Sequence, residues 1–202
     1  MVYDNFVLKE IIHNDENSII QLGEDNTCIK KVDLPKCISR LRNEAECLKI
    51  MNGNIAPKLI AYSDIEYALR MEYIRGYTLS EYVEAYGEIP KYFYVKLVRN
   101  LFELLDNGIE YGADKKINEH FIIDSDNNVR IIDFGISNIY LDRPDIIGRW
   151  KEIYKEEFAF VFTDSEIESI NRSKDDVKTD LIRHCGIKEE LIDKYFATCD
   201  KF

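Results

Sequence analysis

Apolar and polar positions alternate along the first third of the chain, a pattern typical of β-strands with one buried face. The alternating runs predict strands at 6–12, 18–22, 27–32, 59–63 and 68–74. Between the third and fourth runs, Ile38, Leu41, Ala45 and Leu48 recur every three or four residues, which predicts a helix over 38–51. A sheet interrupted by one helix indicates an α+β unit.

Beyond residue 75 the apolar spacing becomes mainly helical. A helix over 78–84 would have Thr78 as its N-cap, and a longer helix over 91–107 would end at Gly108. Two short strands are predicted at 121–123 and 129–132, and further helices at 149–157, 165–171, 175–185 and 188–198. We therefore expect a sheet-containing part over 1–74 and a mainly helical part over 75–202.

Composition narrows the classes of function. The chain carries 38 acidic and 27 basic side chains, a net charge of -11, which disfavours broad binding to nucleic acid. Apolar runs fall short of the roughly 18 to 20 residues that a membrane span requires. The five cysteines are scattered and form no Cys-x-x-Cys pair, and no secretory signal precedes the first predicted strand. We expect a cytoplasmic protein with reduced thiols that binds no membrane.

Two charged residues have defined positions on the third predicted strand and on the following helix. Because side chains alternate along a strand, Lys30 lies on the face opposite to that of Lys31. On the helix, Glu44 borders the apolar stripe between Leu41 and Leu48, whereas Glu46 projects to the other side. Only Glu44 is therefore placed to reach Lys30.

Another carboxylate occupies an unusual place at the end of the predicted hairpin. Asp133 lies between Ile131-Ile132 and Phe134-Gly135, so an acidic group stands among apolar neighbours. Earlier in the chain, the segment Met71-Glu72-Tyr73-Ile74 leads from the fifth predicted strand toward Gly76.

These motifs, in this order, resemble those of the protein-kinase-like superfamily. The resemblance covers roughly residues 6–139 and implies a two-lobed α+β fold, with an antiparallel sheet and one helix in the N-lobe and a reduced, mainly helical C-lobe. It implies that ATP and magnesium are the cofactors, with Lys30 on the phosphates, Glu44 holding Lys30, and Asp133 binding the metal. Met71 would be the gatekeeper, while the Glu72 carbonyl and the Ile74 amide would bind adenine.

The segment from Glu110 to Asp124 departs from the family's catalytic loop, in which an aspartate is followed five residues later by asparagine. We favour Asp114 as the catalytic carboxylate, since Lys115, the alternative when the loop is aligned backwards from the next strand, cannot accept a proton. Asn118 and His120 compete as the second metal ligand. Magnesium prefers oxygen, which favours Asn118, whereas position favours His120.

The loop between the first two strands also departs from the family, because it lacks the glycines that let a backbone approach phosphates closely. If this loop folded over the phosphates, Asp15 and Glu16 would face them unfavourably.

The sequence also lacks Ala-Pro-Glu after Gly135, so the resemblance is to compact members. These are RIO-type kinases, small bacterial serine/threonine kinases and the kinase-like ATPase of tRNA threonylcarbamoyl-adenosine synthesis. The first hypothesis is an ATP- and magnesium-dependent phosphotransferase, whose acceptor is a protein serine or threonine, a small-molecule hydroxyl or water. The second is a pseudokinase that binds nucleotide or a protein partner. An RNA-associated ATPase is a third and weaker hypothesis. The oligomeric state is left open.

Overall fold

The computed structural model describes residues 1–32, 35–112 and 117–157. They form two compact units: the first comprises 1–81 and 111–139, and the second comprises 82–110 and, among the described residues, 140–157. This division differs from the predicted boundary after residue 74, because 111–139 groups with the sheet-containing unit. The helices predicted at 165–171, 175–185 and 188–198 lie outside the described residues.

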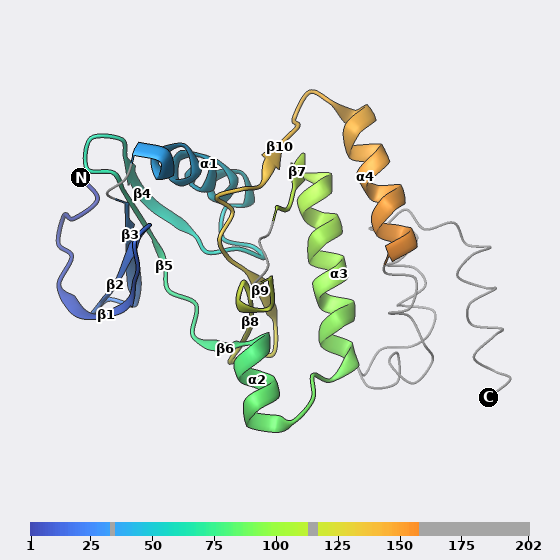
Figure 1. The fold of residues 1–202 in the computed structure, drawn as a ribbon, viewed down its shortest axis with the longest axis horizontal. Coiled ribbons are helices and arrows are strands. Elements are labelled where there is room, and N and C mark those ends of the chain that lie inside the picture. The colour runs from blue at the N-terminus through green and yellow to red at the C-terminus, as the bar shows by residue number, and fades with distance from the viewer. Residues whose placement is uncertain (33–34, 113–116, 158–202) are drawn as a thin grey trace, which may run out of the picture. The chain divides into compact units, whose positions relative to one another are not determined.

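The first unit contains a five-stranded antiparallel sheet with the order β1-β2-β3-β5-β4 (Figure 1). All five predicted strand runs are strands. Their bounds are β1 (Leu8–Asn14), β2 (Ile19–Gly23), β3 (Thr27–Lys31), β4 (Leu59–Ser63) and β5 (Ala68–Glu72). The first alternating run begins at Phe6, whereas β1 begins at Leu8. Phe6 instead packs against a buried cluster that contains Val2.

The N-terminal residues cover one face of this sheet. Val2, Ile29 and Ala68 are fully buried together, and Phe6 packs against them. The Arg70 guanidinium lies 5.4 Å from the centre of the Phe6 ring and donates to Asp25 Oδ2 at 2.5 Å. This face, which we call the closed face, is held by packing and by the contacts of Arg70.

The opposite face of the sheet carries helix α1 (Pro35–Met51). Lys30 is paired with Leu69 and Cys28 with Met71, so these four side chains share one face. Because Lys30 reaches Glu44 of α1 at 2.7 Å, that face lies toward the helix. Figure 1 shows α1 beside this sheet. The helix begins at Pro35, before the predicted start at 38, and ends at the predicted residue.

The rest of the first unit contains a three-stranded sheet with the order β6-β8-β9. Its strands are β6 (Gly76–Thr78), β8 (Phe121–Asp124) and β9 (Val129–Ile131), accompanied by the 3-10 turn η1 (Ile117–Glu119) and β10 (Asn138–Ile139). Thr78 is the N-cap predicted for the helix that follows, α2 (Leu79–Tyr86). Its hydroxyl accepts from the Glu81 amide at 3.1 Å, and the Glu81 carboxylate accepts from the Thr78 amide at 2.8 Å, which is a capping box.

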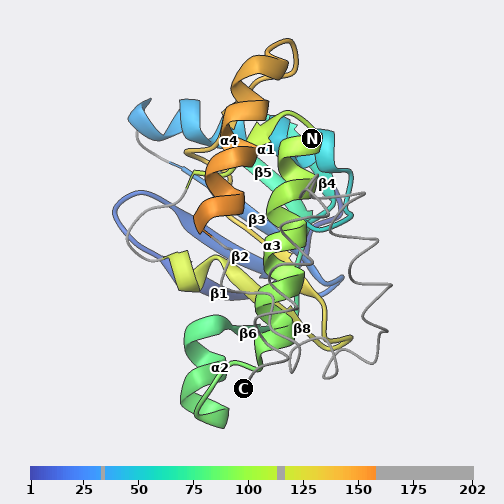
Figure 2. The ribbon, with the colours of Figure 1, turned by 90° about the vertical axis from the view of Figure 1, so that its right-hand side faces the viewer.

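The second unit contains helices α3 (Lys91–Asp106) and α4 (Pro144–Glu157), which lie side by side in Figure 2, and the short strand β7 (Ile109–Glu110). Gly108 ends α3 as predicted: its φ is +77°, and its amide donates to the Leu105 carbonyl at 3.0 Å. The Phe102 and Tyr154 rings meet edge to face at 6.1 Å, which packs α3 against α4. None of the helices in the described ranges has the length and apolar character needed to cross a membrane.

Candidate functional site

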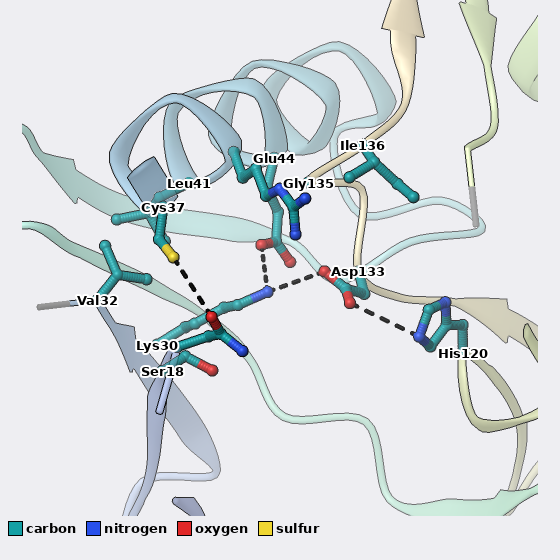
Figure 3. A pocket seen from close by; sticks show the side chains of 12 residues that line it. Ser18, Lys30, Val32, Cys37, Leu41, Glu44, His120, Asp133, Gly135 and Ile136 are labelled. Carbon is teal, nitrogen blue, oxygen red and sulfur yellow. Dashed lines mark hydrogen bonds and ion pairs between the residues drawn. The ribbon is translucent and has the colours of Figure 1, made fainter. Parts of the chain in front are cut away.

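Lys30 of β3 lies at the centre of a partly buried charge cluster, which we define as Lys30, Glu44 and Asp133 (Figure 3). Its Nζ donates to Glu44 Oε2 at 2.7 Å and to Asp133 Oδ1 at 2.9 Å. Burial alone would lower the pKa of Lys30, but the two carboxylates outweigh it and raise that pKa above its usual range. Lys30 therefore stays protonated, and the predicted pair with Glu44 is present.

The two carboxylates of the cluster differ in exposure. The Glu44 side chain is 3% exposed, and burial raises its pKa even though the Lys30 ammonium acts in the opposite direction. The Asp133 side chain is 43% exposed. Burial would raise its pKa too, but the charge and hydrogen bond of Lys30, together with His120 and the Gly135 amide, outweigh burial and hold the pKa of Asp133 below its usual range. Asp133 is thus the ionised carboxylate that a ligand can approach.

The backbone at Asp133 has a positive φ of 59°, which side chains other than glycine adopt infrequently. Such conformations persist where surrounding contacts hold them, and they cluster at functional sites. One such contact comes from Asn43, the neighbour of Glu44 in α1, whose amide donates to the Phe134 carbonyl at 3.1 Å and to the Ser137 carbonyl at 2.7 Å. Asn43 thereby ties α1 to the segment that follows Asp133.

Tyr111 supports the same segment from the other direction. Its hydroxyl donates to the Ile132 carbonyl at 2.8 Å, and its ring meets the fully buried Phe134 ring edge to face at 5.4 Å. Phe134 is therefore fixed in the interior, and the carboxylate of its neighbour Asp133 is directed to Lys30.

The start of the predicted catalytic loop packs closely beside this segment. The Gly112 amide donates to Ser137 Oγ at 3.2 Å, and a Cβ on Gly112 would lie 2.2 Å from the Ile136 carbonyl oxygen. Only glycine permits this approach. The predicted catalytic residue Asp114 and its alternative Lys115 lie outside the described residues, so their roles stay predictions.

The two competing metal ligands lie in different surroundings. His120 Nε2 lies 3.6 Å from Asp133 Oδ2, and its side chain is 12% exposed (Figure 3). Asn118 belongs to η1 and is exposed. The structure therefore brings His120 beside Asp133, as its position in the sequence suggested, and no described contact links Asn118 to the cluster.

A cavity of about 150 Å³ opens beside Lys30. Its walls come from the turn before β2, from β3, from the first half of α1 and from the segment after Asp133 (Figure 3). The lining residues are Asn17, Ser18, Lys30, Val32, Cys37, Arg40, Leu41, Glu44, His120, Asp133, Gly135 and Ile136. The charge cluster forms part of these walls, so a ligand in the cavity would meet Lys30 and Asp133 directly.

The donor set at this cavity fits magnesium that arrives with phosphates. Among the described residues, no group of three or more His, Cys, Asp or Glu side chains could hold a metal ion alone. Magnesium commonly takes one or two carboxylates together with phosphate oxygens, and Asp133 offers one such carboxylate at the cavity. The imidazole of His120 is a poorer ligand for this ion.

The predicted adenine contacts follow the end of β5. Met71 is buried and paired with Cys28, and its gatekeeper role stays a prediction. Burial raises the pKa of the Cys28 thiol to about 12, so the protonated thiol donates weakly to the Glu72 carbonyl at 3.9 Å. Within the described ranges, the Ile74 amide has no hydrogen-bond partner, which leaves a donor for a ligand.

The turn between β1 and β2 contains Asp15 and Glu16, and the expectation that they would face phosphates if the loop folded over them stays a prediction. Asp15 Oδ1 accepts from the Asn17 and Ser18 amides, both at 2.8 Å, and these hydrogen bonds hold the pKa of Asp15 below its usual range. Both acidic residues are exposed, and the cavity is lined instead by Asn17 and Ser18. The acidic side chain is thus used to fold the turn.

Sequence reasoning missed two α1 residues at the site, Arg40 and Asn43. Arg40 lies four residues before Glu44, so helical spacing alone puts both on the same face, and this signal was available. Asn43 directly precedes Glu44, but its acceptors are the carbonyls of Phe134 and Ser137, far along the chain. No local pattern identifies such a contact.

Comparison with curated proteins shows that part of the chain is similar in sequence to serine/threonine protein kinases. The chain is 30% identical over 111 residues to a probable serine/threonine-protein kinase KIN1 homolog of Encephalitozoon cuniculi, which is 52% of this chain and 19% of that protein. It is 29% identical over 131 residues to the probable serine/threonine-protein kinase fnkB of Dictyostelium discoideum (61% and 24%). It is 31% identical over 106 residues to the SNF1-related protein kinase catalytic subunit alpha KIN12 of Arabidopsis thaliana (47% and 21%). The matches therefore span a quarter or less of these relatives' own length.

No protein-family model matches the chain. Among solved structures, the crystal structure of monomeric WbdD superposes with a TM-score of 0.55 at 20% sequence identity, over 75% of this chain and 41% of that chain. At this identity the likeness concerns the fold alone. In sequence, the chain is similar to serine/threonine protein kinases over about half of its length.

Proposed function

We propose that the chain is a kinase-like phosphotransferase that binds ATP with magnesium and transfers the terminal phosphate to a hydroxyl group. The single observation that carries this proposal is the charge cluster, in which one half-buried lysine bridges Glu44 and Asp133 at 2.7 and 2.9 Å. Similarity to serine/threonine protein kinases supports it at the level of the family. The two-lobed arrangement of such kinases is part of the proposal.

Each residue of the cluster has a distinct part in the proposed reaction. Glu44 is buried and holds the Lys30 ammonium by a charge-assisted hydrogen bond, so that Lys30 points at the cavity. Lys30 then stabilises the negative charge of the phosphates, and Asp133 donates a carboxylate oxygen to the metal ion. Bound magnesium would supply further positive charge to the phosphate oxygens.

Two further groups complete the proposed machinery. The Glu72 carbonyl and the Ile74 amide bind adenine at the end of β5, where the amide has no partner within the described ranges. Asp114 orients the acceptor hydroxyl and accepts its proton, since a carboxylate can act as a general base and Lys115 cannot.

The test is an assay of phosphate release and phosphate transfer from ATP with magnesium, in protein whose folding has been verified by circular dichroism. We expect turnover in the wild-type chain and in Lys31→Met, and loss of turnover in Lys30→Met. Lys31 is a matched control because it is the next residue of β3 and faces the other side of the sheet. Equal turnover in both variants would contradict the proposal.

A pseudokinase is the second candidate, and the β1–β2 turn favours it. The turn has no glycine, and Asp15 rather than a ligand accepts the Asn17 and Ser18 amides. A chain of this kind would bind nucleotide and be stabilised by it without turnover. A rise in melting temperature with ATP and magnesium, in the absence of phosphate release, would select this candidate over the first.

A further inference from the structure

The lack of glycine in the β1–β2 turn leaves the proposed site without the backbone donors that commonly hold phosphates. The amides of Asn17 and Ser18 already donate to Asp15 Oδ1 at 2.8 Å. A phosphate bound beside Lys30 must therefore be held by other groups of the cavity wall.

Arg40 is a cation in that wall. It lies in α1 where the helix approaches the segment after Asp133, because a Cβ built on Gly135 would lie 3.3 Å from the Arg40 Cβ. Among the described residues, no ion pair or hydrogen bond engages its guanidinium. By contrast Arg42, two residues along the same helix, donates to Asp64 Oδ1 at 2.8 Å.

Among the described residues of the cavity wall, Arg40 is the cation that forms no ion pair with a carboxylate. Two cations, Lys30 and Arg40, and two carboxylates, Glu44 and Asp133, line the cavity, so their formal charges cancel. Lys30 already forms ion pairs with both carboxylates. A phosphate that arrives with a divalent cation leaves this balance unchanged, and the planar guanidinium suits two phosphate oxygens at once.

The size of the cavity limits its occupant. At about 150 Å³ it is smaller than the roughly 300 Å³ at which pockets for whole small molecules begin. A phosphate group therefore fits within it, and the rest of a nucleotide would extend beyond its walls.

We propose that Arg40 binds the terminal phosphate of a nucleoside triphosphate in this cavity and replaces the contacts that a glycine-rich loop would make. The inference rests on the proposed function for the identity of the nucleotide, although a phosphate site by itself requires only the cavity and its two cations. It assigns Arg40 a binding role, with Lys30 as the second cation of the same cavity wall.

The experiment is isothermal titration calorimetry on wild-type protein, Arg40→Gln and the matched control Arg42→Gln. Three probes are used: ATP with magnesium, tripolyphosphate with magnesium, and adenosine. We expect Arg40→Gln to weaken ATP and tripolyphosphate by about ten-fold or more, since a hydrogen bond to a charged group is lost, and to leave adenosine unchanged. Arg42→Gln should bind all three probes as wild type does.

The outcomes separate this inference from the proposed function. If Arg40→Gln binds ATP as tightly as wild type, the inference is overturned and the nucleotide site stands. A second outcome is that tripolyphosphate binds through Arg40, that adenosine does not bind, and that ATP binds no more tightly than tripolyphosphate. In that case the phosphate site is supported and the assignment of a nucleotide fails. If no probe binds to folded wild-type protein, both are overturned. An equal loss of adenosine and ATP affinity in Arg40→Gln also contradicts the inference, because it indicates a general disturbance of the site.

Discussion

The two faces of the five-stranded sheet are built from neighbouring residues and have different roles. On the face toward α1, Lys30 joins two carboxylates beside a cavity, and one of them, Asp133, is 43% exposed. On the closed face, Ile29 lies fully buried under Val2 and Phe6, and Arg70 is occupied by Asp25 and Thr27. On the first face, the charged groups of Lys30 and Asp133 line a cavity that a ligand can enter. On the second face, the Arg70 guanidinium is engaged in hydrogen bonds within the protein.

This difference allows substitutions on one face to be used as controls for the other. A change on the α1 face should alter ligand binding more than folding, and a change on the closed face should do the reverse.

The largest effect is expected from Lys30→Met compared with Lys31→Met. Loss of the Lys30 charge should lower kcat/KM for ATP by about 100-fold or more, because a charge aimed at the phosphates is removed. Lys31 lies on the face of Ala68 and should change kcat/KM by about two-fold or less. Steady-state kinetics on both variants measures the ratio, and equal losses would remove the distinction between the faces.

The next effect concerns stability and comes from the closed face. Arg70→Ala removes hydrogen bonds to Asp25 Oδ2, the Asp4 carbonyl and Thr27 Oγ1, at 2.5, 2.7 and 3.1 Å. We expect the free energy of unfolding to fall by about 2 kcal/mol, as measured by urea denaturation. Affinity for ATP, measured where the variant is fully folded, should not change. A large loss of affinity at full folding would show that this face also serves the ligand.

A smaller effect is expected from Glu44→Gln compared with Glu46→Gln. The first substitution replaces the charge-assisted hydrogen bond that positions Lys30 with a weaker neutral one, so ATP affinity should fall by about ten-fold. Glu46 is exposed on the other side of α1, and its substitution should leave affinity unchanged. Calorimetric titration distinguishes the two. Similar losses would mean that the helix as a whole, not Glu44, is responsible.

Asn43→Ala tests whether the contact between α1 and the segment after Asp133 is structural. Two hydrogen bonds to the Phe134 and Ser137 carbonyls are lost, and the free energy of unfolding should fall by about 1 kcal/mol. Asn43→Asp should lower it further, because a carboxylate would meet two carbonyl oxygens. Thermal unfolding of the two variants shows which is less stable. An Asn43→Asp variant more stable than Asn43→Ala would rule out the assigned contacts.

The smallest effect is the pH dependence of the β1–β2 turn. The pKa of Asp15 is lowered by hydrogen bonds from the Asn17 and Ser18 amides, so its stabilising contribution is present above the unfolded pKa of about 4. It is lost as the pH falls through the lower, folded pKa. Asp15→Asn should therefore be less stable than wild type at about pH 7 and should approach it at about pH 2. A constant difference across this pH range would contradict the assignment.

How far the sequence predicts this molecule depends on how far apart the contacting residues are. Local rules were sufficient for the Thr78 cap and for the end of α3 at Gly108. For Lys30 and Glu44, which are 14 residues apart, helical spacing selected Glu44 over Glu46, but the pair itself was suggested by the resemblance to a family. The bond between Lys30 and Asp133 spans 103 residues and rests on no periodicity. Only a resemblance to a family could suggest it.

The N-terminal residues illustrate a second limit. Phe6 stands in an alternating run that predicts a strand, but it packs against the cluster of Val2, Ile29 and Ala68. A strand and a short apolar segment that crosses the face of a sheet can show the same alternating pattern in sequence. Which of the two forms depends on burial against distant residues. The arrangement of His120 beside Asp133 likewise followed from position along the chain and not from ligand chemistry.

The central claim is that the charge cluster binds the phosphates and metal of ATP. A crystal structure of the chain with magnesium and a non-hydrolysable ATP analogue tests it most directly. We predict phosphate oxygens on Lys30, magnesium on Asp133 and adenine on the Ile74 amide, with Asp114 facing the terminal phosphate. An analogue bound elsewhere, with the bond between Lys30 and Asp133 unchanged at 2.9 Å, would contradict the account.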